Sequence, residues 1–256
     1  MLRKSLKRKV LFTLAFLFDV YKELSPRSFY SKLYSPLYQE RTIIETLSRM
    51  AKVGEIEKKL VNGEVVLHLA SKGESILNED INLQHLAKKS WDGFWRIVIF
   101  DIEEKARHTR NRLRDKLKSL GFAMWQESVY ITAHAVTEEM NEFFEEKDLF
   151  PNCVCFDAKL SSSFDNKELA SFLFHLDELS LSYSELTIEA ENTINALKNG
   201  KVNKDRAYEL LRDLVERLQL TFLNDPFLPE ELCSEAKERE KAQKTITLLT
   251  KQVVKL

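Results

Sequence analysis

The dipeptide Asn62-Gly63 restricts the fold of this chain more than any other short feature, because strand-like segments lie on both sides of it. Both central residues of a type I′ turn need a positive φ angle, which asparagine and glycine tolerate well. The flanking segments Glu55–Val61 and Glu64–Ala70 are therefore predicted to form a tight β-hairpin. The register follows from placing Val61 opposite Glu64, and it pairs Ile56 with Leu69, Lys58 with Leu67, and Leu60 with Val65. One face of the hairpin should then be mostly apolar and pack on the helices, whereas Glu57, Lys59 and His68 lie on the other.

Three helical segments are predicted before the hairpin. The first covers about Leu6–Leu24, and its apolar run Val10–Phe18 follows several basic residues, as in a secretory signal. No small-residue cleavage site follows, so we interpret the run as a helix of the folded protein. Ser25-Pro26 and Ser35-Pro36 each offer an N-cap followed by proline at the first helical position. They predict a second helix over Pro26–Tyr34 and a third from Pro36 to about Val53, ended by Gly54.

Three helices followed by a hairpin is the element order of a winged helix-turn-helix, in which the third helix enters the major groove of DNA. Residues 1–72 hold 14 Lys or Arg and 7 Asp or Glu, a net charge of +7, although the whole chain carries −1. This imbalance favours a polyanionic partner, double-stranded DNA, for the first domain. A small module that binds protein stays open as an alternative. The candidate DNA-binding residues are Gln39, Arg41, Thr42, Glu45, Arg49, Lys52, Lys59 and Asn62.

The middle of the chain predicts a ferredoxin-like βαββαβ unit. Its first strand is the apolar run Trp95–Ile102, which we expect to be buried on both faces of a sheet. The elements expected after it are a helix over Glu103–Leu120, strands over Phe122–Trp125 and Ser128–Thr132, a helix over Thr137–Lys147 and a strand over Asn152–Asp157. The first of these helices is rich in arginine and lysine. We expect this helix face to be exposed to solvent, with its charges in ion pairs, rather than to bind nucleic acid.

Asp101 ends the first strand of this unit and could either cap the next helix or hold Mg²⁺ for phosphodiester cleavage. No neighbouring motif completes a metal site, so we expect the structural role, no enzymatic activity and no cofactor. The three cysteines exclude a complete disulfide framework. Cys153 and Cys155 have strand spacing and should point to the same face. We expect them and Cys233 to be buried free thiols of a cytoplasmic protein.

The last third predicts helices. One helical stretch covers Lys167–Asn199, with a break near Ser180–Ser184, and Gly200 ends it. Asn203 caps a helix that runs to about Leu223. Asp225-Pro226-Phe227-Leu228-Pro229 predicts a turn, because a residue before proline disfavours helix. A final helix is expected over about Glu230–Val254. The predicted α+β chain thus has three domains: a winged helix over 1–80, a ferredoxin-like domain over 91–160 and a helical domain over 165–256.

Three stretches of this chain resemble the PaaX-like transcriptional regulators, the repressors of phenylacetic acid degradation. They are Glu40–Gly54 with its Leu47-Ser48-Arg49-Met50, Trp91–Arg96 through Asp101-Ile102, and Asp225–Leu232. The resemblance implies a winged helix, a middle domain similar to the CRISPR-associated spacer-acquisition endonuclease, and a helical C-terminal domain. It also implies a homodimeric repressor that binds palindromic operators and is released, in the type member, by an acyl-CoA effector.

The chain departs from that family's pattern in two places. Ile44 stands where the family's recognition helix commonly has arginine, and Cys233-Ser234-Glu235-Ala236 replaces a Trp-Pro-Gly. The operator and the small-molecule effector are therefore not carried over from the resemblance. Two alternatives to a repressor stay open: a Mg²⁺-dependent nuclease using Asp101, to which the middle domain's similarity points, and a non-catalytic DNA-binding partner in a larger assembly. None of these three possible functions requires binding to a membrane.

Overall fold

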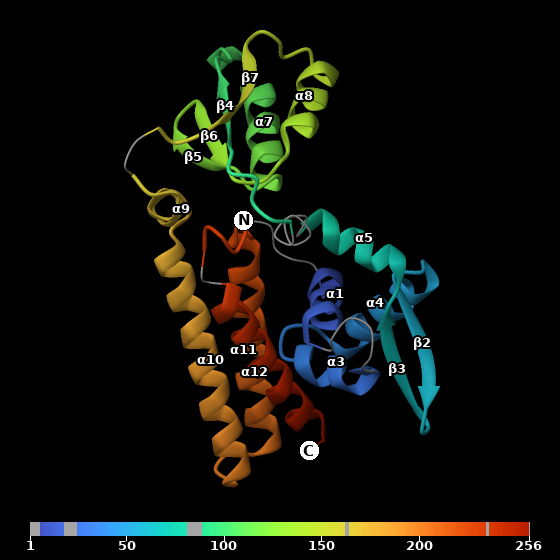
Figure 1. The fold of residues 1–256 in the computed structure, drawn as a ribbon. Coiled ribbons are helices and arrows are strands. Elements are labelled where there is room, and N and C mark those ends of the chain that lie inside the picture. The colour runs from blue at the N-terminus through green and yellow to red at the C-terminus, as the bar shows by residue number, and fades with distance from the viewer. Residues whose placement is uncertain (1–5, 18–24, 81–88, 162–163, 234–235, 256) are drawn as a thin grey trace. The chain divides into compact units, whose positions relative to one another are not determined.

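The computed structural model describes residues 6–17, 25–80, 89–161, 164–233 and 236–255. The chain forms two compact units (Figure 1). The first unit combines described residues from 1–80, 181–224 and 237–256, and the second combines those from 81–180 and 225–236. Among the described residues, no helix is both long and apolar enough to cross a membrane.

Among its described residues, the N-terminal part of the first unit has four helices and a three-stranded antiparallel sheet. The helices are α1 (Leu6–Leu17), α3 (Arg27–Tyr34), α4 (Glu40–Lys52) and α5 (Ser71–Asp80), and the sheet consists of β1 (Ser25–Pro26), β2 (Ile56–Val61) and β3 (Glu64–Leu69). The strand order is β1-β3-β2. The register of β2 with β3 is the one predicted, including Ile56 opposite Leu69 and Leu60 opposite Val65.

Helix α1 is buried on all sides rather than along one stripe. Every residue from Val10 to Leu17 is buried. A helix that is apolar around its whole circumference needs neighbours around its whole circumference. Helices α4 and α5 and strand β3 contact α1 from the N-terminal part, and Phe222 of α11 packs on Phe12 and Phe16 at ring-centroid distances of 5.7 and 5.0 Å.

The C-terminal helices of this unit are α10 (Leu176–Lys198), α11 (Lys204–Asn224) and α12 (Ala236–Lys255). The helix α10, whose first turn belongs to the second unit, contacts α11 through the rings of Tyr183 and Phe222 and through the ion pair between Glu189 and Arg217. Lys241 of α12 lies 3.6 Å from Glu191 of α10. The three helices therefore pack together as a bundle (Figure 1).

The second unit contains a four-stranded antiparallel sheet with two helices on one face (Figure 1). Its strands are β4 (Trp95–Phe100), β5 (Ala123–Gln126), β6 (Val129–Thr132) and β7 (Cys153–Ala158), in the order β5-β6-β4-β7. The helices are α7 (Arg107–Ser119), preceded by the short turn η1 (Glu104–Ala106), and α8 (Thr137–Glu146). The elements follow one another in the predicted βαββαβ order.

The two faces of this sheet have separate cores. Val98, Phe100 and Tyr130 pack with Leu113 and Leu117 of α7 on one face. The other face is covered by α9 (Asn166–Phe174) and by the segment after Asp225, and that core joins Trp95, Ile131 and Ala133 to Leu169, Leu173, Leu228 and Leu232. The prediction that the first strand is buried on both faces holds for Trp95 and Val98 but is wrong for Ile99, whose exposed fraction is 44%.

The predicted turn Asp225–Pro229 carries the chain back to the sheet of the second unit. The Nε2 atom of His134 lies 2.9 Å from the carbonyl oxygen of Pro226, and Asp225 accepts a hydrogen bond from the backbone N–H of Phe227. The backbone N–H of Trp91 donates to Glu231 over 3.3 Å. Two of the three stretches that carry the family resemblance, Trp91–Arg96 and Asp225–Leu232, are therefore neighbours in space.

The second helix is confirmed as α3, but neither serine-proline pair begins a helix as predicted. Ser25-Pro26 forms β1, which pairs with Val66 and Leu67, and α3 begins only at Arg27. A proline at the sheet edge needs no N–H for a ladder bond, so this position tolerates it. Ser35-Pro36 closes α3 instead of starting the next helix: the N–H groups of Leu37 and Tyr38 bond back to Tyr34, and α4 begins at Glu40.

Three helix boundaries also differ from the predictions. The break expected near Ser180–Ser184 lies at His175, which has a φ of 51° and separates α9 from α10. Serine lowers helix propensity only slightly, so it does not interrupt a helix that is held by packing. The final helix does not begin at Glu230, because residues up to Leu232 pack on the sheet of the second unit. The predicted first-helix segment 18–24 lies outside the described residues. Helix α5 was not predicted.

Gly73 of α5 lets this helix approach the rest of the N-terminal part closely. A Cβ atom at this position would lie 2.2 Å from the backbone oxygen of Glu55. That oxygen already accepts a hydrogen bond from the N–H of Ala70, so it cannot move away freely. The close contact between α5 and the start of the hairpin therefore requires glycine.

We expect Gly73→Ala to lower the free energy of unfolding by about 1–3 kcal/mol, the usual cost of an added carbon in a packed site. Urea denaturation followed by circular dichroism measures the change. The control is Ser75→Ala at an exposed position of the same helix, which should change the free energy of unfolding by less than about 0.5 kcal/mol. Equal stability of the two variants would contradict the close packing of α5.

Candidate nucleic-acid interface

Helix α4 separates its apolar side chains from its polar ones. Ile43, Thr46, Leu47 and Met50 are buried and face the N-terminal core. All eight residues predicted to bind DNA have exposed side chains, six of them on or beside α4 and two on the hairpin: Gln39, Arg41, Thr42, Glu45, Arg49, Lys52, Lys59 and Asn62. The structure thus leaves this set accessible to a partner.

The hairpin turn has the predicted backbone geometry. Asn62 has a φ of 51° and Gly63 a φ of 81°, so both residues of the turn adopt the left-handed conformation. Leu60 lies at the strand end next to the turn and is 73% exposed, so the helices do not cover this end of the hairpin. The prediction that the Ile56–Leu60 face packs on the helices is therefore correct at Ile56 and wrong at Leu60.

The side of the hairpin that faces α4 carries Lys58 rather than Lys59. The Nζ atom of Lys58 lies 3.4 Å from the hydroxyl oxygen of Ser48 on α4. Burial lowers the pKa of Lys58, and the nearby charge of Arg27 lowers it further. Lys59 is the next residue in the strand, so its side chain points to the opposite face. Sequence reasoning missed Lys58 and Arg27, although the predicted register already placed Lys58 on the inner face.

The cationic character of α4 is partly neutralised within the helix. Arg41 Nε donates to Glu45 Oε1 over 2.7 Å, and the two side chains are 87% and 64% exposed. A pair this exposed contributes little to stability because water screens it. The pair matters more for any anionic partner of this face, because Glu45 holds a guanidinium group that would otherwise be free to contact a phosphate.

A hollow of about 290 Å³ lies beside this surface, between α3, the start of α4 and the hairpin turn. Ile44, which stands at the position where the resembled family has arginine, lines it together with Ile43 and Leu47. Ser28 of α3 donates a hydrogen bond to Glu64 at its edge. The centre of α4 therefore offers an apolar contact surface rather than a bidentate donor for a base.

Asp101, the residue of the nuclease alternative, has an exposed side chain at the end of β4. The expectation that it caps the next helix is wrong: the residues before η1 and α7 are Glu103 and Ala106, and neither end has a side-chain cap. Across the described residues, no three His, Cys, Asp or Glu side chains lie close enough to hold a metal ion. The structure thus supplies Asp101 with no set of protein ligands in the described ranges.

The cysteines are free, and Cys153 and Cys155 point to the same face of β7, into the core shared with α7 and α8. Cys153 and Cys233 are buried and Cys155 is partly buried. Burial raises the pKa of the Cys153 and Cys155 thiols to about 11. Metal binding needs the thiolate form, so this environment opposes it at neutral pH.

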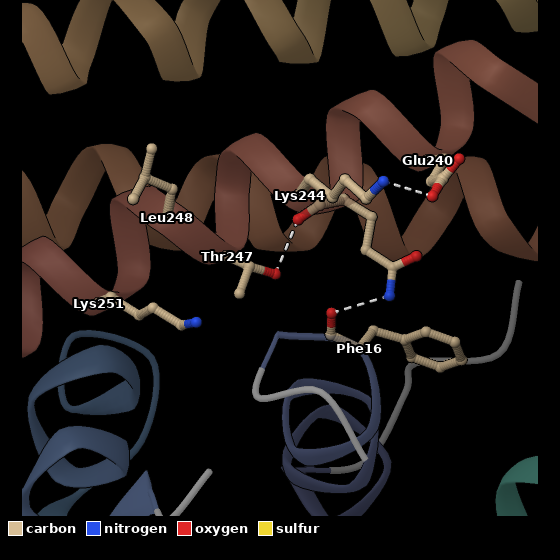
Figure 2. Close-up of a pocket in the computed structure, with 7 residues that line it drawn as sticks. Phe16, Glu240, Lys244, Thr247, Leu248 and Lys251 are labelled. Carbon is tan, nitrogen blue, oxygen red and sulfur yellow. Dashed lines mark hydrogen bonds and ion pairs between the residues drawn. The ribbon is translucent and has the colours of Figure 1, made fainter. Parts of the chain in front are cut away.

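A second hollow, of about 340 Å³, lies between the end of α1 and α12 (Figure 2). Gln243 donates to the backbone oxygen of Phe16 over 3.1 Å, and Lys244 lies 2.5 Å from Glu240. Leu248 and the ring of Phe16 supply the apolar part of the lining. Binding sites for small molecules are mostly apolar with a few unpaired polar groups. Five of the seven lining residues have polar side chains and the Lys–Glu pair is already satisfied, so the hollow does not identify an effector site.

Two family models match the chain. Residues 88–170 match the PaaX protein central Cas2-like domain, and residues 174–256 match the PaaX-like protein C-terminal domain. Together the two matches cover well over half of the chain. Comparison with curated proteins found no match.

One similar solved structure is an uncharacterized protein, Rv0674, from Mycobacterium tuberculosis. It is 18% identical in sequence, with a TM-score of 0.58 and 98% of each chain covered. At that identity the likeness concerns the fold alone. The whole chain, including the N-terminal part that neither family model covers, thus has a counterpart of the same overall fold.

Proposed function

Because this chain belongs to the PaaX-like family, we propose that it is a DNA-binding transcriptional regulator that acts as a dimeric repressor. In this proposal residues 1–80 form a winged helix-turn-helix, with α4 in the major groove and the hairpin β2–β3 on the DNA backbone. The observation that carries the proposal is the exposed polar face of α4 beside the projecting hairpin, on the most basic part of the chain. The residues around 91–160 form a ferredoxin-like domain, and those over 165–256 a helical domain.

The exposed side chains fit two kinds of contact. Arg41, Arg49 and Lys52 suit phosphate oxygens, and Gln39 and Thr42 can form hydrogen bonds with base edges. Lys59 and Asn62 on the hairpin suit the adjacent backbone. The proposal includes no catalytic step, and it names no effector because the hollow between α1 and α12 does not select one.

The second unit supplies a surface for the proposed homodimer. Ile99 and Phe156 are 44% and 50% exposed. Ile97 pairs with Phe156 and Ile99 with Val154, so these side chains share the sheet face opposite α7 and α8. The segment after Asp225 and α9 cover only part of this face. An apolar patch is chemically compatible with its own copy, and a two-fold symmetric interface brings the same patch of both subunits together.

Sequencing of the fragments that the purified protein selects from a random DNA pool tests the function directly. We expect an inverted repeat whose half-sites are centred about 10 base pairs, or a multiple of that distance, apart. Failure to enrich any sequence, together with no salt-dependent affinity for duplex DNA, would contradict the proposal. Cleavage of DNA or RNA in the presence of Mg²⁺, abolished by Asp101→Asn, would instead support the nuclease alternative.

Charge reversal of Arg41, Arg49 and Lys59 to glutamate should weaken binding to the selected duplex by about 100-fold or more. Each lost phosphate contact lowers the slope of log K against log salt by about 0.9, so the slope should fall by two to three. Fluorescence anisotropy over a salt series measures both values. The matched control reverses three exposed lysines of the C-terminal part: Lys198 of α10, Lys201 between α10 and α11, and Lys237 of α12. Equal losses in the two triple variants would show a nonspecific charge effect and refute the assigned face.

Glu45→Gln should strengthen binding several-fold, because it removes a negative charge from the DNA face and frees Arg41. The salt slope should become steeper by about one contact. Glu209→Gln, which breaks the equivalent exposed pair with Arg206 on α11, is the control and should leave affinity unchanged. Weaker binding of Glu45→Gln to the selected sequence alone would show that this carboxylate accepts from a cytosine amino group instead.

Phe156→Glu should convert the dimer to a monomer, because a buried unpaired charge at an apolar interface is strongly unfavourable. Sedimentation velocity measures the assembly state, and circular dichroism confirms that the variant is folded. Leu220→Glu introduces the same change at a 58% exposed leucine of α11 and should leave the dimer intact. A Phe156→Glu variant that stays dimeric would place the interface elsewhere.

A further inference from the structure

A stripe of arginines runs along one flank of helix α7 in the second unit. Arg107, Arg110 and Arg114 recur at intervals of three and four residues, which places them above one another on the helix surface. We call these three residues the arginine stripe. With Asn111 they line a hollow of about 370 Å³, and they are the only residues of the described part of the chain in its lining. At a rise of about 1.5 Å per residue the stripe is about 10 Å long.

The arginine stripe has no acidic counterpart in the described part of the chain. Arg110 donates to the backbone oxygen of Ile102 over 2.6 Å, which fixes its position, but none of the three guanidinium groups forms an ion pair there. We expected the basic residues of this helix to form ion pairs, and on this flank of α7 they do not form them with described residues. Three like charges held this close repel one another unless an anion from outside lies between them.

The opposite flank of α7 behaves differently. Arg112 and Lys116 lie near α8: the pKa of Glu146 is lowered first by its hydrogen bond with Lys147 and further by these two cations. Lys116 also lies 5.9 Å from the centre of the Phe143 ring. The basic residues of this flank thus interact within the second unit, and they provide a natural comparison for the stripe.

The lining of the hollow selects the class of ligand. Sites for small organic molecules are mostly apolar, with a few polar groups that orient the ligand. The described residues that line this hollow supply guanidinium groups and one amide, which suits repeated phosphates instead. Each DNA strand carries a phosphate about every 3.4 Å of helix axis, so a stripe of this length can meet two or three of them. An open row of cations fits a polymer better than a single compact anion.

We propose that the arginine stripe of α7 is a second DNA-backbone contact, which binds the phosphates of duplex DNA outside the segment read by α4. This inference rests on the proposed function, because it takes duplex DNA as the partner. It adds that the Cas2-like domain contributes to affinity without reading sequence, since its groups can contact only phosphates.

The test uses the full-length protein and the selected DNA in two lengths, one limited to the inverted repeat and one extended by about a helical turn, ~10 base pairs, on each side. The variant is Arg107→Gln/Arg114→Gln, which leaves the Arg110 bond to Ile102 in place. On the long duplex we expect the salt slope to fall by about two and the affinity about tenfold at moderate salt. On the short duplex the variant and the wild type should bind almost equally.

The control is Arg112→Gln/Lys116→Gln, which removes the same charge from the other flank and should leave the salt slope on both duplexes unchanged. An Arg107→Gln/Arg114→Gln protein with wild-type slope and affinity on the long duplex would overturn the inference. The inference would also be overturned if Arg107→Gln/Arg114→Gln lost binding to inorganic tripolyphosphate but kept its DNA binding. The stripe would then bind a soluble anion. If the wild type binds no duplex at all, the proposed function itself fails, which is a separate outcome.

Discussion

The burial of α1 on all sides is the constraint on which the first unit depends. Phe12 and Phe16 pack on Phe222 of α11, while the same helix contacts β3, α4 and α5. Polar groups reinforce the contact: Thr13 and Tyr34 share a hydrogen bond of 2.7 Å, and Lys9 pairs with Glu216 of α11. Burial of the phenol raises the pKa of Tyr34. The helices that present the candidate DNA face are thus anchored on a helix that the C-terminal bundle also covers.

This arrangement gives the first and last thirds of the chain a shared core. A displacement of α11 would change the packing around Phe12, and through α1 it would reach α3 and α4. Packed cores transmit such shifts because they have few voids in which to absorb them. If α4 binds DNA as proposed, this shared core would couple the packing of the C-terminal helices to DNA affinity without a separate hinge.

Local signals in the sequence predicted local structure well. Asn62-Gly63 determined both the turn and the register of the hairpin, because only a few turn types fit two residues of positive φ. Serine-proline pairs were misleading because the same dipeptide starts a helix, ends one or edges a sheet, and only tertiary contacts decide among these. Likewise, the predicted register placed Lys58 on the inner face, but its contact with Ser48 required knowledge of where α4 lies.

Long-range contacts could not be read from the sequence. Trp91 and Glu231 are far apart in the chain, yet they share a hydrogen bond, and Trp95 packs in one core with Leu228 and Leu232. The resemblance to a family marked both stretches without showing why they belong together. The structure supplies the physical reason: the turn after Asp225 covers part of the sheet face that α9 leaves open, and Leu228 and Leu232 bury their side chains there together with Trp95.

The charge pattern shows most clearly where sequence reasoning stops. A net charge of −1 hides a basic N-terminal part and a basic α7, and counting residues treats every lysine and arginine alike. The structure divides them by their partners: Arg41 is held by Glu45, the Arg112 and Lys116 flank of α7 faces α8, and the arginine stripe has no described acid beside it. Specific recognition of DNA needs both base contacts and backbone contacts. A polar helix face with an apolar centre at Ile44 has few strong donors for bases, so in the proposed complex with DNA phosphate contacts elsewhere on the molecule would carry a larger share of the affinity.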